Sequence, residues 1–481
     1  MDSNKNFQPV IGLEIHMQLS TKSKMFSPEK NTFGEFPNTF ISPISLAHPG
    51  TLPTVNKEAI NYAICLGLAC KSTVCRKNYF ARKNYFYPDL PKGFQITQDQ
   101  TPICQGGEIS FSVNGKPKTI NLNRIHLEED TAKLIHDLYP DYTCIDFNRA
   151  GIGLLELVTA PELKSPEEAY AFLYELRRLV RYLNICDGDM EKGSLRCDAN
   201  ISIMPEGSDI FGERVEIKNI NSIKNVQLAL EYEIQRQINL ICNGGKVEKE
   251  TRTFDAENGI TLSMRSKESS VDYRYFVEPD LPPFFVSDAW IEKVKKSMPL
   301  LPSEYREKLL NELHVNEYNT NVLIENKQLL DLFEKLSENT KDFNNIANWI
   351  LGPIKGYFNE YKLSLDLVFS KVDEIKKLIE LVENKKISYS VATQTLLPII
   401  FENDEKDPLA LAQRLNLLQN DDVTFIEPLV KEVIAAYPDK VEKYKSGKKG
   451  LLGFFVGEVV KKIANANPAI VSSLMKKNLD E

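Results

Sequence analysis

Residues 10–18 alternate apolar side chains with side chains that can bind a metal ion or carry a proton. The period of two predicts a half-buried strand, with Glu14, His16 and Gln18 together on one face. Alternate side chains on a strand face lie about 7 Å apart, so a carboxylate and an imidazole there can share one cation or one phosphate. An amphipathic strand with a solvated face gives the same pattern.

Two further stretches carry acidic side chains that suit the same site. Residues 124–130 read Arg-Ile-His-Leu-Glu-Glu-Asp, and Glu156 stands in an apolar run over residues 152–158. A carboxylate in such a run costs free energy to bury unless a cation pairs with it. With Glu14 and His16, these acids form an oxygen-rich set that suits Mg²⁺ or Mn²⁺ better than zinc.

Strand alternation leaves a choice between two neighbouring glutamates in this stretch. It places Glu128 on the face of His126 and Asp130, and it places Glu129 on the opposite face. Periodicity alone does not decide which of the two glutamates belongs to the metal site.

Residues 82–95 combine bases, aromatic rings and two prolines, which predicts a shaped loop rather than a strand. Lys83 and Lys92 can hold phosphate or carboxylate, or line a polar passage. A solvated loop on a packed aromatic stem is the alternative.

A mixed polar strand face is predicted further along the chain. Arg196, Asp198 and Asn200 follow Ser194 at alternate positions, and Lys218 can join them from a neighbouring strand. Beside a magnesium site, such a face supplies positive charge for nucleotide phosphates and acids for the metal. The sequence has neither the P-loop nor the Rossmann glycine pattern, and a salt-bridged polar strand face is the alternative.

Strands and helices must hold these side chains in place. Strands are predicted at residues 124–130, 154–158, 200–204 and 214–217. One helix begins after the capping residue Ser165, and another runs from about Val226 to Ile241 and stops at Gly244-Gly245. Helices inserted between mostly antiparallel strands predict an α+β fold.

Length and composition exclude several classes of protein. At 481 residues the chain is too long for one core, and a net charge of −8 argues against a protein coated with basic residues. No apolar run has the length of a membrane span, and the first residues lack the build of a signal peptide, so we expect a cytoplasmic protein. Eight cysteines without a Cys-x-x-Cys pair predict free thiols.

The composition changes near residues 285–300 and again near 401–408. We therefore expect three domains, which span residues 1–292, 293–405 and 406–481. Residues 441–481 hold eight lysines and four acids, a net charge of +4 at the end of an acidic chain. A solvated helix face is one reading of this basic stretch.

Several of these stretches resemble the GatB/GatE family, the B subunits of bacterial aspartyl/glutamyl-tRNA amidotransferases, over nearly the whole chain. The matching motifs are VIGLEIHMQL, RKNYFYPDLPKGFQITQ, RIHLEED, GLLELV, MEKGSLRCDANISI, VEIKNINS, MRSKESSVDYRYFVEPDLPP and GKKGLLGFFVGEVVKK. The resemblance implies a ligase that forms C–N bonds with ATP as co-substrate. It would phosphorylate the side-chain carboxylate of misacylated Glu-tRNA(Gln) or Asp-tRNA(Asn), and ammonia would then form the amide.

The resemblance also implies an architecture and partners. A cradle similar to the glutamine synthetase catalytic fold is followed by an all-α domain and a small helical tail that resembles YqeY proteins and holds tRNA. An amidase A subunit would supply ammonia through a channel, and a small C subunit would complete a heterotrimer.

Site residues implied by the resemblance fall into four groups. The metal ligands for Mg²⁺ or Mn²⁺ are Glu14, His16, Glu129 and Glu156, and the catalytic residues are Glu14, His16, Glu129 and Lys83. The ammonia channel is lined by Lys83, Lys92 and Glu129. The nucleotide is held by Ser194, Arg196, Asp198, Asn200 and Lys218, and tRNA by Lys448, Lys449, Lys461 and Lys462. The resemblance selects Glu129, and we follow it over the alternation argument because a strand end or bulge can rotate one residue.

Two departures from the family pattern matter, one in the tail and one that bears on cofactors. In the tail, residues 461–468 lack the threonine and glycine that are common there. Many family members carry four zinc-binding cysteines near residues 26–45, but this stretch has no cysteine, so we expect no structural zinc. A non-catalytic tRNA-binding scaffold and a free-standing Mg-ATP ligase are the alternative functions. The intact acids argue against the first, and the absence of any glutaminase signature indicates dependence on a partner.

Overall fold

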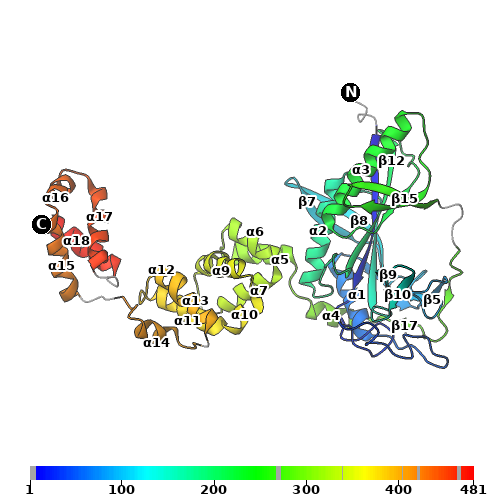
Figure 1. The fold of residues 1–481 in the computed structure, drawn as a ribbon, viewed down its shortest axis with the longest axis horizontal. Helices are drawn as coiled ribbons and strands as arrows, with labels where there is room; N and C mark the ends of the chain where they lie inside the picture. Colours follow the sequence, from blue (N-terminus) through cyan, green and yellow to red (C-terminus); the bar gives the residue numbers. More distant parts are fainter. Residues whose placement is uncertain are drawn as a thin grey trace. The chain divides into compact units, whose positions relative to one another are not determined.

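The computed structural model describes residues 7–266, 272–338, 340–403, 405–419, 423–462 and 467–480. The chain folds into two compact units, Met1–Tyr305 and Arg306–Glu481 (Figure 1). The first unit mixes strands and helices, and every described element of the second is helical, so the α+β prediction is confirmed. Within the motif at 264–283, residues 267–271 lie outside the described ranges.

One sheet of ten strands forms the frame of the first unit. Its strands are β1 (Phe7–Gln18), β2 (Thr73–Val74), β6 (Cys104–Gln105), β7 (Glu108–Val113), β8 (Lys116–Glu129), β11 (Gly153–Thr159), β12 (Leu195–Pro205), β13 (Val215–Lys218), β14 (Glu250–Asp255) and β15 (Ile260–Ser266). Their spatial order is β15-β14-β13-β12-β1-β11-β8-β6-β2, and β7 also pairs with β8. Neighbouring strands are antiparallel apart from the parallel pair β13 and β14, as the prediction of a mostly antiparallel sheet requires.

The alternating pattern of β1 separates a buried face from an open one. The apolar side chains at alternate positions from Ile11 to Met17 are at most 1% exposed. They share one core with apolar side chains of α1 (Lys57–Ala69), α2 (Pro166–Tyr182) and α3 (Ile223–Cys242). Burying a large apolar side chain contributes about 1.5–3 kcal/mol, so this core fixes which face of β1 turns toward the helices.

The sequence signals at the helix ends act as predicted. Ser165 Oγ accepts a hydrogen bond from the backbone N–H of Glu168 at 3.3 Å, at the start of α2. The Glu168 carboxylate accepts one from the backbone N–H of Lys164 at 2.6 Å, which satisfies a second donor at this end. After α3 the chain turns at Gly244, whose φ of 78° is readily adopted only by glycine. The four predicted strands correspond to β8, β11, β12 and β13.

Residues 82–95 differ from the predicted loop at both ends. β4 (Ala81–Asn84) and β5 (Phe94–Thr97) pair with each other, and β4 also pairs with β16 (Phe276–Val277). The prediction of a loop was therefore wrong for the residues in β4 and β5, because their pairing partners stabilise strands too short to show a period of two. Two further pairs are β3 (Lys77–Asn78) with β17 (Phe284–Phe285) and β9 (Lys133–Tyr139) with β10 (Tyr142–Asp146).

From residue 288 onward, the elements in the described ranges are all helices. The helices are α4 (Asp288–Ser297), α5 (Pro302–Glu307), η1 (Lys308–Glu312), α6 (Glu317–Glu325), α7 (Lys327–Leu336), α8 (Phe343–Trp349), η2 (Ile350–Ile354), α9 (Lys355–Tyr361), α10 (Leu365–Ser370), α11 (Val372–Glu383), α12 (Tyr389–Val391), η3 (Ala392–Leu396), α13 (Leu397–Glu402), α14 (Pro408–Arg414), α15 (Val423–Ala436), α16 (Pro438–Lys445), η4 (Lys449–Leu451), α17 (Leu452–Lys462) and α18 (Pro468–Asp480). Helices α15 to α18 share an apolar core that includes Ile426, Phe455 and Met475. Across the described ranges, no helix is long and apolar enough to cross a membrane.

Candidate active site on the open face of the sheet

The polar face of β1 lies opposite the core, and strand register aligns four side chains across it. His16 pairs with Arg196 of β12 on one side and with Glu156 of β11 on the other. Glu156 in turn pairs with His126 of β8. Residues in register on antiparallel neighbours have Cβ atoms about 5 Å apart, so this row brings two imidazoles to one carboxylate.

His16, Glu128 and Glu156 form a group that fits a divalent cation. One ligand atom from each lies within 4.8 Å of the other two. His16 Nε2 is 3.2 Å from the Glu156 carboxylate and 3.5 Å from that of Glu128. One imidazole nitrogen with two carboxylates is a donor set that suits Mg²⁺ or Mn²⁺.

A second histidine couples to the same carboxylates. His126 Nε2 lies 3.3 Å from Glu156 and 3.7 Å from Glu128. Burial lowers the pKa of His126, but the two carboxylates outweigh burial and raise that pKa to about 9. Burial also lowers the pKa of His16, and the hydrogen bond to Glu156 leaves it raised. Burial raises the pKa of Glu128 and Glu156, yet the imidazoles hold both below their usual range, so both acids are ionised.

Glu129 points away from this group. It forms an ion pair with Lys92, and its Oε1 accepts a hydrogen bond from the backbone N–H of Ile96 at 2.9 Å. The register of β8 on β11 runs unbroken through Glu128 and Glu129, so there is no bulge at these residues, although β8 does end at Glu129. The alternation argument, which grouped Glu128 with His126, agrees with the structure. A ligand role for Glu129 stays a prediction that rests on the resemblance alone.

Glu14 lies beside the group along β1, on the same face. Its Oε1 accepts a hydrogen bond from Asn200 Nδ2 at 2.9 Å. Asp198, which pairs with Glu14 in register, accepts one from Lys218 Nζ at 2.5 Å, and Glu216 lies 3.1 Å from the same nitrogen. Burial lowers the pKa of Lys218, but the two acids outweigh burial and raise it above its usual range, so the lysine is charged.

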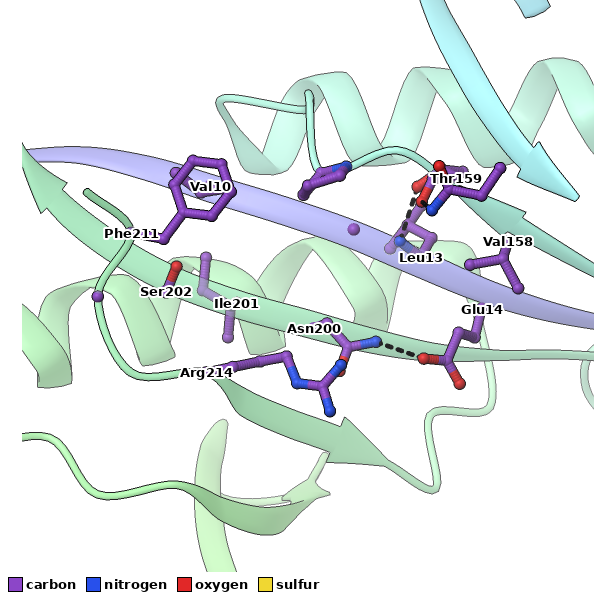
Figure 2. Close-up of a pocket in the computed structure, with 14 residues that line it drawn as sticks. Val10, Leu13, Glu14, Val158, Thr159, Asn200, Ile201, Ser202, Phe211 and Arg214 are labelled. Carbon is purple, nitrogen blue, oxygen red and sulfur yellow. Dashed lines mark hydrogen bonds between the residues drawn. The ribbon is translucent and has the colours of Figure 1, made fainter. Parts of the chain in front are cut away.

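A cleft of about 520 Å³ opens over this face. The predicted site residues that line it are His16, Lys83, Arg196, Asp198 and Lys218, and Glu128 joins them. Ser194 and Asn200 do not line the cleft. The Ser194 hydroxyl donates to the Asp187 carboxylate, and Asn200 lines a neighbouring pocket (Figure 2). The structure therefore brings together most, but not all, of the predicted nucleotide-binding residues.

Sequence reasoning missed Asp130, a buried acid that holds the Arg196 side chain in position at the cleft. Asp130 accepts hydrogen bonds from Arg196 at 2.9 Å and from Gln18 at 2.7 Å, and Arg149 Nε lies 3.7 Å away. Burial raises the pKa of Asp130, but the two guanidinium groups hold it below its usual range. Asp130 and His126 belong to the RIHLEED motif, and alternation puts both on the strand face that carries Glu128. This shared face is the sequence signal that could have identified them as site residues. The sequence carried no signal for Arg149.

Lys92 and Glu129 line a second cavity, of about 230 Å³. Lys83 lines the cleft instead, with Nζ 4.9 Å from the centre of the Tyr273 ring. Glu128 lines the cleft while the adjacent Glu129 lines the cavity. The Lys92–Glu129 ion pair therefore belongs to the second cavity, while the neighbouring residue Glu128 belongs to the cleft.

The four predicted tRNA-binding lysines are exposed, and most of them are paired. Ion pairs join Lys449 to Asp480 at 3.0 Å, Lys461 to Glu458 at 2.6 Å and Lys462 to Glu432 at 2.6 Å. Within the described ranges, Lys448 makes no ion pair. The surface of this region is thus less basic than the count of lysines indicated, and the tRNA role of these residues stays a prediction.

Two family profiles match the chain. The profile described as "GatB/GatE catalytic domain" matches residues 9–292, which include the whole cleft, and the profile described as "GatB domain" matches residues 331–479. Curated relatives match almost end to end. One from Trichlorobacter lovleyi, the B subunit of an aspartyl/glutamyl-tRNA(Asn/Gln) amidotransferase, is 44% identical over 98% of this chain and 99% of its own length.

Two further relatives carry the same name. The protein from Thermodesulfovibrio yellowstonii is 44% identical over 99% of this chain and 100% of its own length. The protein from Oceanobacillus iheyensis is 41% identical over 99% of each. These likenesses confirm the family and the amidotransferase role that the motifs predicted, and the chain belongs to the GatB/GatE family.

Proposed function

We propose that the chain is the ATP-using, amide-forming subunit of an amidotransferase that acts on tRNA misacylated with glutamate or aspartate. The observation that carries this proposal is the group of His16, Glu128 and Glu156 on an open sheet face. His16 and Glu128 of this group line one cleft together with Arg196 and Lys218. The names of the relatives support the substrate class.

The reaction has two steps. A side-chain carboxylate oxygen of the aminoacyl group attacks the γ-phosphorus of ATP, the bond from that phosphorus to the bridging oxygen breaks, and ADP leaves. Ammonia then attacks the acyl carbon, and phosphate leaves with a proton from the nitrogen. Phosphorylation is needed because a carboxylate by itself is a poor acylating agent.

The residues of the cleft serve the first step by charge and position. Mg²⁺, which His16, Glu128 and Glu156 would hold, supplies positive charge against the phosphates. Arg196 and Lys218 place two fixed cations on the same face, where phosphate oxygens bind. Asp198 holds Lys218 in place, so little reorganisation is needed when the phosphates arrive.

The cavity beside Lys92 and Glu129 supports a passage for ammonia. In this proposal the Lys92–Glu129 ion pair, which lines the cavity, would separate the cavity from the cleft, which Lys83 lines. A passage of this kind delivers ammonia while it keeps water away from the acyl phosphate.

The proposal assigns a role to each part of the chain. Residues 1–292 form the catalytic cradle, residues 293–405 a helical domain, and residues 406–481 a YqeY-like tail that contacts tRNA. Because the relatives are themselves named as one subunit of their enzyme, a multi-subunit assembly is supported. In our proposal an amidase A subunit makes the ammonia, and a small C subunit completes a cytoplasmic heterotrimer.

The testing experiment follows ADP release from the assembled complex. The complex receives Mg-ATP and either Glu-tRNA(Gln) or Asp-tRNA(Asn), with every ammonia source omitted. Glu156→Gln is the loss variant because Glu156 contacts both histidines. Glu108→Gln is the matched control, since Glu108 lies on β7 and pairs with the exposed Lys71.

We expect ADP release that depends on the misacylated tRNA, disappears in Glu156→Gln and persists in Glu108→Gln. Normal tRNA binding without tRNA-dependent ADP release, on both tRNAs, would contradict the proposal. That result would favour the tRNA-binding scaffold.

A further inference from the structure

One wall of the second cavity, which has a volume of about 230 Å³, is a loop without helix or strand, residues 41–53. The loop residues that line the cavity are Ile44, Ser45, Ala47, His48, Thr51 and Pro53. Residues 48–50 are exposed to solvent, so the loop also forms part of the molecular surface. The position of this loop therefore decides whether the cavity is closed on this side.

Hydrogen bonds do not fasten the loop itself to the rest of the first unit. Within the described ranges, residues 41–53 form hydrogen bonds only to one another. The backbone N–H of His48 donates to the Pro43 carbonyl at 2.8 Å, and Ser42 Oγ accepts from the backbone N–H groups of Ile44 and Ser45. These turns give the loop its shape, but its polar anchors lie at its two ends.

Both ends of the loop are held by the segment that follows β1. At the far end, the backbone N–H of Thr54 donates to the Phe26 carbonyl at 2.9 Å. At the near end, the Phe40 carbonyl accepts a hydrogen bond from Lys24 Nζ at 2.8 Å. Two anchors that lie two residues apart in the chain thus fix the loop at its start and at its end.

The Lys24 side chain lies behind the wall of the cavity. It is 0% exposed and forms no ion pair within the described part of the chain, so backbone carbonyls are its partners. Its Nζ also donates to the Phe147 carbonyl at 3.4 Å, and a Cβ built on Gly151, which lines the cavity, would lie 3.5 Å from Lys24 Cδ. A buried ammonium needs its hydrogen bonds, and bonds from a charged donor are strong, so Lys24 holds these carbonyls firmly.

Asn38 makes a second contact that fixes the chain just before the loop. Its Nδ2 donates to the Ile145 carbonyl at 3.1 Å, and its Oδ1 accepts from the backbone N–H of Phe147 at 2.8 Å. Its φ of 58° lies in the left-handed region, which glycine adopts readily. A glycine at this position would therefore remove the two contacts and keep the path of the backbone.

We propose that Lys24 is a positioning residue for the ammonia passage. Its ammonium holds residues 41–53 in place as a wall of the second cavity, so that ammonia in the cavity reaches the cleft before it reaches water. The Ser45 hydroxyl supports a small polar occupant, because it belongs to this wall, is shielded from water and has no hydrogen-bond partner among the described residues. The inference rests on the proposed function, since it takes the second cavity as part of the passage.

The test measures how tightly glutamine hydrolysis is coupled to amide formation in the complete heterotrimeric complex. The complex receives Mg-ATP and misacylated tRNA, with either glutamine or ammonium chloride as the nitrogen source. Lys24→Met keeps an unbranched side chain and removes the ammonium. Lys22→Met is the matched control, because Lys22 is an exposed lysine of the same segment. Asn38→Gly loosens the start of the loop from the surface, and it decides the test if Lys24→Met does not assemble.

We expect Lys24→Met to lower the amide formed per glutamine hydrolysed about threefold or more, with the missing nitrogen released as free ammonium, because a displaced wall opens the cavity to water. Amide formation from ammonium chloride and tRNA-dependent ADP release should match those of the unmodified complex. Asn38→Gly should change the coupling in the same direction, and Lys22→Met should leave it unchanged.

Unchanged coupling in Lys24→Met would overturn the inference, as would unchanged coupling in Asn38→Gly if Lys24→Met does not assemble. An equal loss of amide from glutamine and from ammonium chloride would also overturn it, because that pattern indicates a general structural role. If the unmodified complex forms no amide from either nitrogen source, the proposed function itself fails.

Discussion

At the scale of single residues, one step along β8 separates two environments. Glu128 contacts His16 in the cleft, and Glu129 pairs with Lys92 beside the second cavity. Adjacent residues of a strand point to opposite faces, so the two carboxylates cannot both join the metal group without a bulge. Substituting Glu128 and Glu129 one at a time therefore compares the role of a carboxylate in the cleft with that of a carboxylate beside the second cavity.

This pair gives a test of the metal site. Glu128→Gln should weaken Mn²⁺ binding to the complex about tenfold or more, because it removes one of the three ligand groups. Glu129→Gln should change Mn²⁺ binding little and should instead slow amide formation relative to ADP release. Equilibrium titration with Mn²⁺ measures the first effect. The opposite order of the two variants would return the ligand role to Glu129.

Lys24 is a buried cation that holds the loop after β1. It is 0% exposed, and its Nζ donates to the Phe40 carbonyl at 2.8 Å and to the Phe147 carbonyl at 3.4 Å. Burial lowers the pKa of Lys24 from 10.5 to about 8, although Glu29, Asp146 and Glu129 oppose this. The charged form is thus disfavoured in the folded protein.

A pH dependence of stability follows. Below pH 8 the folded and unfolded states are both protonated at Lys24, and the full cost of burying the charge is present. Between pH 8 and 10.5 the unfolded state binds more protons, so the free energy of unfolding should rise with pH, by up to about 3 kcal/mol. Denaturant titrations of the unmodified chain and of Lys24→Met should differ by this increment, and parallel profiles would contradict it.

At the scale of elements, the candidate active site lies on one face of the large sheet. The helices that pack on the other face determine which face stays open. Only the register of β12, β1, β11 and β8 brings Arg196, His16, Glu156 and His126 into one row. Helices α1, α2 and α3 cover the opposite face through the apolar side chains of β1. A one-residue slip of β1 would turn His16 into the core, so packing of the helices protects the site.

The N-terminal cap of α2 allows a measurement of how much this helix contributes to the stability of the first unit. Ser165→Ala should lower the free energy of unfolding of the first unit by about 1 kcal/mol, because the backbone N–H of Glu168 loses its acceptor. Ser165→Asp keeps an acceptor and serves as the control. Chemical denaturation followed by the tyrosine signal measures both. Equal losses in the two variants would show that the cap contributes nothing.

At the scale of the whole molecule, charge is divided unevenly along the chain. The net charge is −8, yet residues 441–481 carry +4. Lys449 and Lys461 form ion pairs with Asp480 and Glu458, which this sum already counts, and Lys462 pairs with Glu432, which lies outside the segment. Contacts with tRNA from this region would therefore replace existing ion pairs, which lowers their net gain.

Removal of residues 406–481 tests the role of this region. In the assembled complex, the truncated chain should show a raised KM for misacylated tRNA, while kcat and the glutaminase activity of the partner persist. A full-length variant with Lys448, Lys449, Lys461 and Lys462 changed to Gln is the control for charge alone. An unaltered KM in the truncated complex would contradict a tRNA role for this region.

The sequence by itself determined the α+β class, the main strands and helices, and the polar face of β1, because these follow from periodicity and capping over a few residues. It also grouped Glu14, His16 and Glu156 as residues that suit one metal site. It left Glu128 and Glu129 undecided, and the resemblance selected the glutamate that the structure keeps out of the group.

Only the tertiary structure decided which side chains meet. Strand register set the row from Arg196 to His126, and distant pairing turned parts of residues 82–95 into β4 and β5. The neighbouring pocket at Phe211 and Arg214 (Figure 2) also had no signal in the sequence, since its walls come from five separate stretches of chain. Local periodicity reports the face of a strand, whereas a site depends on which strands lie beside it, and that is fixed by long-range packing.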